Sequence, residues 1–337
     1  MRGILVAAIV TVLPVPTWAQ SPTPVTVDNF IRAESDTYIG NLAKESGGLA
    51  KLLHHREPAS VDNQTVIRLN RDTLYSFAAF DFNAGPVTIT LPDAGKRFMS
   101  LMAVSQDHYA RTVYGKGPHT FTRDQIGTRY GLLGIRTFVD PNDPEDVKKV
   151  HALQDAITAN QKGGPGKLEL PTWDAESQKK VRDALLVLAS TMRDFKRAFG
   201  TKSEVDPVHH LIGTAAGWGG NPDKDAVYLS FTPQKNDGAT VYRLIVKNVP
   251  VEAFWSVSVY NAQGYYEKNP QNAYSLNSVT AKKGSDGAVA IQFGGCDGKV
   301  QNCLPIMKGW NYTVRLYRPR QEILNGTWKF PEPQAAN

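Results

Sequence analysis

Cysteine is scarce in this sequence, with only Cys296 and Cys303 among 337 residues. The two residues enclose Asp-Gly-Lys-Val-Gln-Asn, a turn-prone string that can bring two strand ends together. The pair therefore predicts a local disulfide, which in an oxidising compartment would stabilise the fold by roughly 2 to 3 kcal/mol. The alternative is a metal or redox pair, but the spacing matches neither a close-spaced redox pair nor a zinc set.

Excess charge is also small, since 38 Lys and Arg stand against 32 Asp and Glu and give a formal net charge of +6. The basic residues are scattered along the chain rather than gathered in a stripe that would suit a phosphate backbone. We therefore do not expect a nucleic-acid partner.

Long apolar runs are missing beyond the first residues, where Ile4 to Leu13 follow a positive start at Arg2. With the small-x-small context that ends at Ala19, this pattern predicts a secretory signal peptide over residues 1–19 and a periplasmic or secreted mature protein. The alternative is a membrane anchor, but a run of about ten residues is half the length needed to span a bilayer. Pro14 and Pro16 also break it, so the mature form is expected to have no membrane span.

The common catalytic motifs are absent as well: there is no Gly-x-Ser-x-Gly elbow, zinc-binding His-Glu-x-x-His, phosphate-binding loop or dinucleotide glycine fingerprint. The pairs His54-His55 and His209-His210 do not suit a metal, because adjacent side chains point in different directions in helices and strands. Surface or capping roles are expected for these histidines. The sequence predicts neither a metal site nor a cofactor.

What is present is a pattern of short strands interrupted by helices. Helical spacing is found over 27–42, 145–160 and 173–199, and the last has an apolar stripe predicted to face the core. The stripe consists of Val181, Leu185, Leu188, Met192, Phe195 and Phe199. Strands are predicted over 65–69, 74–80, 86–91, 97–104, 130–139, 226–231, 240–247, 254–260, 288–293 and 312–317.

This pattern predicts a mainly β protein with a helical portion. After the signal peptide we expect a linker and helix over 20–50, a β-sandwich over 51–141, a helical segment over 142–200 and a β-domain over 201–333. The Pro-rich tail after Phe330 is expected to be disordered.

Several short motifs carry a resemblance to a known pair of families. In the first half they are Asn70-Arg71-Asp72-Thr73-Leu74-Tyr75-Ser76, Leu91-Pro92-Asp93 and Asp107-His108-Tyr109. In the second half they are Phe254-Trp255-Ser256-Val257, Val259-Tyr260-Asn261, Asn272-Ala273-Tyr274-Ser275-Leu276, Leu304-Pro305, Arg315-Leu316-Tyr317 and Gly326-Thr327-Trp328. In these motifs the chain resembles the paired families named domain of unknown function 1254 (N-terminal) and domain of unknown function 1214 (C-terminal).

The resemblance covers most of the chain from about residue 50 to residue 333. It implies an immunoglobulin-like β-sandwich, inserted helices and a C-terminal jelly-roll-like β-domain. It does not imply a reaction, because a shared fold does not determine chemistry.

The densest polar cluster lies where one predicted strand ends and the next begins, and consists of Arg68, Asn70, Arg71, Asp72 and Tyr75. Arg offers a bidentate fork for a carboxylate, Asp can act as a base, and Tyr can donate a hydrogen bond to a ligand oxygen. The alternative is that Arg71 and Asp72 brace a tight turn through backbone groups.

His108 follows a predicted strand, so we expect it at a sheet edge or rim, where it could act as an acid or base. The alternative is an ordinary surface or capped histidine. With Asp72 and Tyr75 it completes the predicted catalytic set.

The second half contributes aromatic and amide side chains that suit a sugar-like or ring-containing ligand: Trp218, Tyr228, Tyr260, Asn261, Asn272 and Tyr274. With Arg68, Asn70 and Arg71 they form the predicted substrate-binding set. The alternative is that such residues fill β-cores and turns, and we expect that role for Trp255, Trp310 and Phe254.

Two functions follow from these residues. The first is a metal-independent enzyme that acts on a small polar or ring-containing substrate in a cleft between the β-domains. In it Asp72 or His108 takes a proton, and Tyr75 or Arg71 stabilises negative charge. The second is a non-catalytic module that binds a carbohydrate, a lipid fragment or another envelope protein. Exposed strand edges also favour a homo-oligomer.

Overall fold

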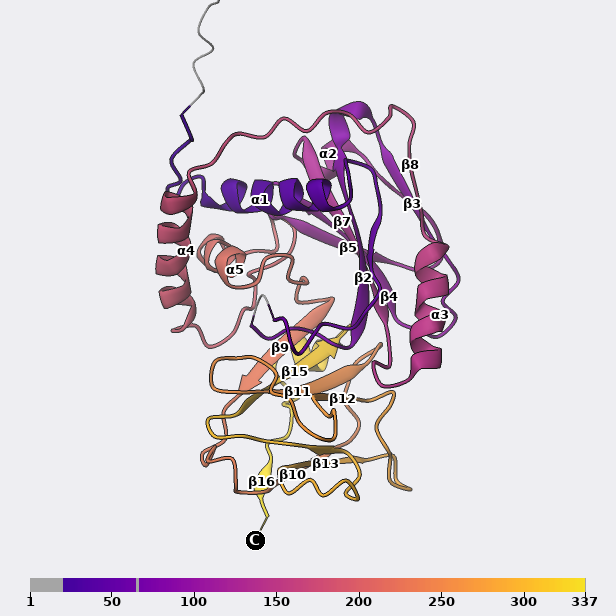
Figure 1. Cartoon of the computed structure of the whole chain (residues 1–337), viewed down its shortest axis with the longest axis vertical. Coiled ribbons are helices and arrows are strands. Elements are labelled where there is room, and N and C mark those ends of the chain that lie inside the picture. The colour runs from indigo at the N-terminus through magenta and orange to yellow at the C-terminus, as the bar shows by residue number, and fades with distance from the viewer. Residues whose placement is uncertain (1–20, 65–66, 337) are drawn as a thin grey trace, which may run out of the picture.

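Two β-rich halves follow each other along the chain and are stacked one above the other in the computed structural model (Figure 1). The structure describes residues 21–64 and 67–336. The predicted signal peptide and the first two residues of the predicted 65–69 strand lie outside these ranges. None of the helices in the described ranges has the length and apolar content needed to cross a bilayer.

The N-terminal half is built on a five-stranded antiparallel sheet in the order β1-β2-β7-β4-β5. Its strands are β1 (Leu53–His55), β2 (Thr73–Asp81), β4 (Met99–Ser105), β5 (Ala110–Tyr114) and β7 (Tyr130–Phe138). A three-stranded sheet in the order β6-β3-β8 packs against one face and consists of β3 (Val87–Leu91), β6 (Gly117–Phe121) and β8 (Thr158–Gln161). The two sheets share one apolar core, to which Phe80, Ile89 and Leu133 belong.

The helix α1 (Phe30–Glu45) covers the other face of the five-stranded sheet. The helices α4 (Ala175–Ala189) and α5 (Pro207–Gly217) pack against α1. Ile39 of α1 packs on Ala79 and Leu132 of the sheet. The helix α3 (Pro144–Asp155) lies on the opposite flank, and the short elements α2 (Arg123–Ile126) and η1 (Phe82–Ala84) complete this half (Figure 1).

The C-terminal half consists of two four-stranded sheets in the orders β14-β13-β10-β16 and β12-β11-β15-β9. Their strands are β9 (Ala226–Phe231), β10 (Tyr242–Val246), β11 (Trp255–Tyr260), β12 (Ser275–Asn277), β13 (Val289–Phe293), β14 (Cys303–Leu304), β15 (Asn311–Tyr317) and β16 (Gln334–Ala335). A helix α6 (Gln321–Leu324) follows β15. Trp255 and Trp310 lie in the core between the sheets, and Phe254 is buried in a neighbouring cluster, so the core roles predicted for these residues are confirmed.

The sheet that contains β9, β11 and β15 is the one that meets the N-terminal half (Figure 1). Phe138 at the end of β7 packs on Phe254, with ring centroids 4.9 Å apart, and both belong to one apolar cluster with Tyr317. The boundary between the halves is therefore a packed interface.

Most predicted strands are confirmed, but residues 67–69 do not form the predicted strand. Several elements were not predicted: β1, β5, β6, β12, β14 and α5. Two helices and the tail also differ from the prediction. The helix expected to continue to residue 199 ends at Ala189, because the hydroxyls of Ser190 and Thr191 donate to carbonyls of its last turn. Leu188, predicted to be in the core, is accordingly 50% exposed.

The helix α3 likewise ends at Asp155, and β8, which was not predicted, follows it and pairs with β3. The tail expected to be disordered contains β16, whose residues Gln334 and Ala335 pair with β10. Edge strands of a sheet offer unpaired backbone groups, which explains why short segments far away in sequence attach to them.

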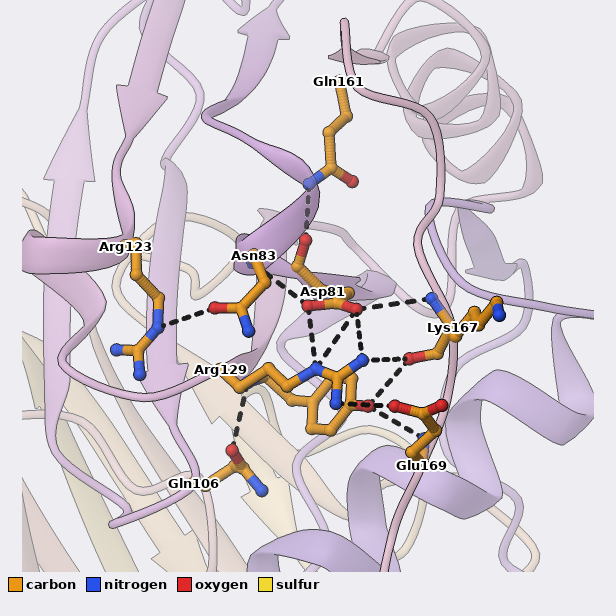
Figure 2. A network of polar contacts seen from close by, with 9 residues as sticks. Asp81, Asn83, Gln106, Arg123, Arg129, Gln161, Lys167 and Glu169 are labelled. Atoms are coloured by element: carbon orange, nitrogen blue, oxygen red, sulfur yellow. Dashed lines mark hydrogen bonds and ion pairs between the residues drawn. The ribbon is translucent and has the colours of Figure 1, made fainter.

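A polar network fixes the loop after β8 to the N-terminal half (Figure 2). The Asp81 carboxylate, nearly buried, pairs with Arg129 at 3.0 Å and accepts hydrogen bonds from the backbone of Asn83 and Lys167. Gly166 passes so close that a Cβ there would lie 2.6 Å from Asp81, and its φ of 73° also favours glycine.

The predicted disulfide is confirmed. Cys296 and Cys303 are bonded, with Cα atoms 5.7 Å apart, and the bridge closes the loop between β13 and β14.

Candidate functional site at the junction of the two halves

A row of polar side chains crosses the five-stranded sheet at the end that meets the C-terminal half. Tyr75 on β2 is paired with Arg136 on β7, which is paired with Ser100 on β4, which is paired with Tyr114 on β5. Paired residues in neighbouring strands project from the same face, so these four side chains lie next to one another. We call them the polar row.

Arg136 is 9% exposed and has few protein partners. Its Nη2 donates to the carbonyl oxygen of Gly219 at 2.7 Å, its Nη1 contacts the sulfur of Met102 at 3.8 Å, and its guanidinium lies 5.6 Å from the ring centroid of Tyr75. No carboxylate in residues 21–64 and 67–336 forms an ion pair with it, and residues 1–20 and 65–66 contain no Asp or Glu.

Three tyrosines influence the charge of Arg136: Tyr75, whose ring lies against the guanidinium, Tyr228 and Tyr317. Burial by itself lowers the pKa of the Arg136 guanidinium, but the nearby phenolic oxygens raise it, which indicates that they lie close to the charge. Two of the tyrosines come from β9 and β15, so the C-terminal half supplies part of the environment of Arg136.

Asparagine amides orient these hydroxyls. The backbone N–H of Asp72 donates to Oδ1 of Asn70 and so fixes the orientation of that amide. Its Nδ2 then donates to the hydroxyls of Tyr75 and Tyr317, each at 3.1 Å, while Asn221 Nδ2 donates to Tyr228 at 2.7 Å. Since each phenolic oxygen accepts a hydrogen bond, each hydroxyl hydrogen can be donated to another group.

The far end of the polar row is also rich in hydroxyls. Ser100 is 1% exposed, and its Oγ has no hydrogen-bond partner among the described residues. The neighbouring Tyr114 donates its hydroxyl to Asp225 at 2.8 Å, and burial raises the pKa of the Asp225 carboxyl. Within the described part of the chain, Ser100 is therefore a buried donor without an acceptor.

Aromatic rings flank the polar row on the same side of the sheet. Tyr75 stacks on Phe77 with ring centroids 5.5 Å apart, and Trp218 packs with Phe77 in one cluster and with Met102 in another. Tyr75, Phe77, Trp218 and Tyr228 are each partly exposed, so solvent reaches the aromatic side of the junction.

His108 lies behind Trp218 and not at a rim, contrary to the prediction, because Trp218 and Phe199 cover its ring. Its Nε2 accepts from the N–H of Gly219 at 2.8 Å, so Nδ1 carries the proton and donates to Thr214 at 2.7 Å. Burial, and then the nearby His210, hold the pKa of His108 well below its ordinary value.

His108 is thus neutral and fully hydrogen-bonded, and it contacts the polar row only through the peptide of Gly219. His210, for which a surface or cap role was predicted, is instead 2% exposed and stacks on Tyr109, because α5 lies against the loop that contains Asp107.

Asp72 is buried on the C-terminal side of the junction. Its Oδ2 accepts from the hydroxyl of Ser256 at 2.5 Å, and its Oδ1 has no partner among the described residues. Burial raises the pKa of this carboxyl, while the nearby Arg315 opposes the shift. Asp72 in turn contributes, after burial, to raising the pKa of the Tyr317 hydroxyl.

Arg68 and Tyr260 join the two halves structurally. Arg315 donates to the hydroxyl of Tyr260 and to the backbone oxygen of Arg68, both at 2.8 Å. The Arg68 guanidinium donates to Asn311 and Thr313, each at 2.9 Å. These contacts hold the segment before β2 on the C-terminal sheet.

Arg71, Asn272 and Tyr274 lie instead at an open cleft of about 1170 Å³ whose walls come from both halves. The Arg71 guanidinium lies 5.4 Å from the ring centroid of Tyr274, which is 7% exposed, and bonds the backbone oxygen of Ala59. Asn261 braces a turn by accepting from the backbone N–H of Tyr265. The cleft therefore offers polar side chains but little exposed aromatic surface.

The structure brings four of the predicted residues, Asn70, Asp72, Tyr75 and Tyr228, to one place, and Trp218 lies beside them. It places His108 behind them and Arg71 outside them. Arg136, Ser100 and Tyr317 were missed by the sequence interpretation. A signal for Arg136 was present, since it is the one charged residue in β7, a strand whose nine residues are all buried.

Family comparisons agree with the order of the two halves. The family DUF1254, described as protein of unknown function, matches residues 49–161, and DUF1214, with the same description, matches residues 227–321. The chain belongs to both families. These matches cover the N-terminal sheets and most strands of the C-terminal half. No curated protein matches the chain.

Solved structures share this fold. The protein VPA0106 from Vibrio parahaemolyticus is 20% identical, with a TM-score of 0.70 over 92% of this chain and 98% of that one. An uncharacterized protein from Burkholderia cenocepacia is 12% identical, with a TM-score of 0.52 over 92% of this chain and 88% of that one. At these identities the likeness concerns the fold alone.

Proposed function

We propose that this DUF1254–DUF1214 protein is exported and that the junction of its halves binds a small ligand that combines a ring with hydrogen-bonding groups. The observation that supports this binding function most directly is the polar row with the aromatic rings that flank it. Buried hydroxyl and guanidinium donors lie beside partly exposed aromatic surfaces, the combination that small-molecule sites use for orientation and affinity.

The open cleft supports this function less well than the junction does. Its amides are occupied in part by the protein: Asn272 accepts from Tyr274, and Asn269 both donates to and accepts from the backbone of Ala273. Without an exposed ring it lacks the flat apolar face on which a sugar or aryl ring would pack.

Export is supported by two features of the chain. The first residues have the pattern of a secretory signal peptide, and the disulfide between Cys296 and Cys303 suits an oxidising compartment such as the periplasm.

A second candidate is a metal-independent enzyme at the same site. It is favoured by Asp72, a buried carboxyl that accepts from Ser256 and lies close to the Tyr317 hydroxyl, because burial raises the pKa of this carboxyl and so favours the form that can donate a proton. In this candidate Tyr75 and Arg136 stabilise negative charge on the substrate. Loss of turnover but not of ligand binding in Asp72→Asn would support the enzyme over the binding protein.

Ligand-observed NMR titration with benzyl alcohol and benzoate tests the binding function. We expect at least one of these phenyl probes to bind the native protein and the double variant Tyr75→Phe/Tyr228→Phe to bind it roughly tenfold more weakly, since two hydrogen bonds are lost. Tyr242→Phe is the control, because Tyr242 lies on β10 in the distant sheet, where its hydroxyl accepts from the backbone N–H of Lys235. Failure of both probes to bind, or equal affinity in the double variant, would show that the junction is not the site.

A further inference from the structure

We propose that the ligand of the junction carries a carboxylate, which binds to Arg136. This inference rests on the proposed function and names the chemical class of its ligand. It follows from comparing the hydrogen-bond and ion-pair partners of Arg136 with those of other buried or partly buried arginines.

Arg315, which is buried, and Arg97 and Arg182, which are partly buried, have carboxylate partners or several oxygen acceptors. Arg97 pairs with Asp146 at 2.5 Å, and both side chains are at most 17% exposed. Arg182 pairs with the buried Glu34 at 2.5 Å. Arg315 has oxygen acceptors from Ser258, Tyr260 and the backbone, and Asp72 lies close to it.

Arg136 is the exception among the buried arginines described here. Among the described residues its guanidinium donates to one carbonyl oxygen, that of Gly219, and contacts a thioether sulfur, which is a weak acceptor. The Tyr75 hydroxyl beside it is a further neutral oxygen, so none of these groups carries a negative charge. A buried guanidinium keeps its charge at any physiological pH, and leaving such a charge without a counter-ion is unfavourable. Residues kept at a cost to stability are frequently those required for binding or catalysis.

The groups around Arg136 are themselves donors. The hydroxyls of Tyr75, Tyr228 and Tyr317 are near the guanidinium, and those hydroxyls accept from asparagine amides, so their hydrogens are available. Ser100 lies beside Arg136 in the polar row and has no acceptor in the described ranges. An anion with several lone pairs satisfies this set, whereas a cation would be repelled.

A carboxylate fits better than a phosphate monoester. A single guanidinium neutralises one negative charge and matches the two oxygens of a carboxylate in a bidentate pair. A phosphate monoester carries up to two charges, and the second would remain unpaired here. The partly exposed rings of Phe77 and Trp218 add an apolar surface, so an aryl carboxylate is the expected class.

Binding of two similar probes separates the charge of the ligand from its ring. We expect benzoate to bind the native protein at least tenfold more tightly than benzyl alcohol, and Arg136→Met to abolish this preference. Equal affinities would overturn the carboxylate inference while leaving the proposed function intact. Absence of binding by both probes would overturn the proposed function and this inference with it.

A second measurement needs no ligand. If Arg136 lacks a counter-ion in the protein, Arg136→Met, which keeps an unbranched apolar stem but removes the guanidinium, should leave the urea midpoint unchanged or raise it. Arg97→Met, which leaves Asp146 without its partner, should lower the midpoint. If Arg136→Met lowers the midpoint as much as Arg97→Met, or does not fold, Arg136 is a structural residue and the inference is wrong.

Discussion

Tyr75 and Arg136 are direct neighbours across β2 and β7, and the Arg136 guanidinium lies 5.6 Å from the centre of the Tyr75 ring. A phenol ring and a guanidinium attract each other at this distance, so the pair keeps the cation in place without neutralising it. The polar row thus presents a positive charge together with hydroxyl donors at the boundary of the two halves.

Asp72→Asn should stabilise the protein at neutral pH. The pKa of Asp72 is raised in the folded state, so protonated Asp72 stabilises the fold at pH values below the ordinary pKa of aspartate. This contribution to stability is lost as pH rises through the raised pKa. Asn keeps the hydrogen bond from Ser256 without the charge. Urea unfolding should show a more stable variant at pH 7 and no difference near pH 3.

Asp62→Asn is the control for this experiment, because Asp62 is exposed and pairs with Lys268 at the surface. An Asp72→Asn variant that is less stable than the native protein at pH 7 and equal at pH 3 would mean that the charged form is favoured in the fold.

His108 should make the fold sensitive to mild acid. Its pKa is depressed in the folded state, so neutral His108 stabilises the fold at pH values above the ordinary pKa of histidine. This contribution to the unfolding free energy is lost as pH falls below that ordinary pKa. Between the ordinary and the depressed pKa the loss amounts to about 1.4 kcal/mol per pH unit. His108→Asn, a residue that tolerates the φ of 60° at this position, should flatten the dependence of unfolding free energy on pH between 7 and 5.

His119→Gln, at a partly exposed position on β6, is the control and should leave the dependence of unfolding free energy on pH as in the native protein. A slope that is the same in His108→Asn as in the native protein would show that His108 does not titrate differently in the folded state.

Arg129→Met should destabilise the fold through Asp81. The change removes the ion-pair partner of a nearly buried carboxylate that keeps only backbone donors (Figure 2). We expect a loss of roughly 1 to 3 kcal/mol in unfolding free energy. Arg123→Met, which removes only a contact with Asn83, should change stability little, and equal losses in the two variants would contradict the role given to Asp81.

The double variant Cys296→Ser/Cys303→Ser should be less stable by about 2 to 3 kcal/mol, because the short loop gains entropy in the unfolded chain. Thiol titration of the denatured, unreduced native protein should find no free thiol. Two thiols per chain would contradict the bridge. Affinity for benzoate should not change, since the loop joins β13 and β14 in the sheet away from the junction.

Much of the fold could be predicted from local pattern. Alternation of apolar residues located β3 and β10, and strand composition located β2 and β7. Elements that form only through tertiary contacts were not predicted. One of them is β16, which is a strand because it pairs with β10. The specific immunoglobulin-like and jelly-roll-like topologies stay predictions, as does the homo-oligomer.

The site could be predicted only in part for the same reason. Asn70, Asp72 and Tyr75 stand close together in sequence, so their shared location followed from the chain itself. Arg136 becomes their neighbour through the register of β2 and β7, which a single sequence does not specify. Burial of His108 depends on Trp218, far along the chain, and no local pattern indicates it.

The most direct test of the account is a crystal structure of the native protein grown with benzoate at a concentration that saturates binding in solution. We predict the carboxylate within hydrogen-bond distance of the Arg136 guanidinium and of at least one hydroxyl among Tyr75, Tyr228 and Tyr317. Benzoate bound elsewhere, with the polar row unchanged, would contradict the account.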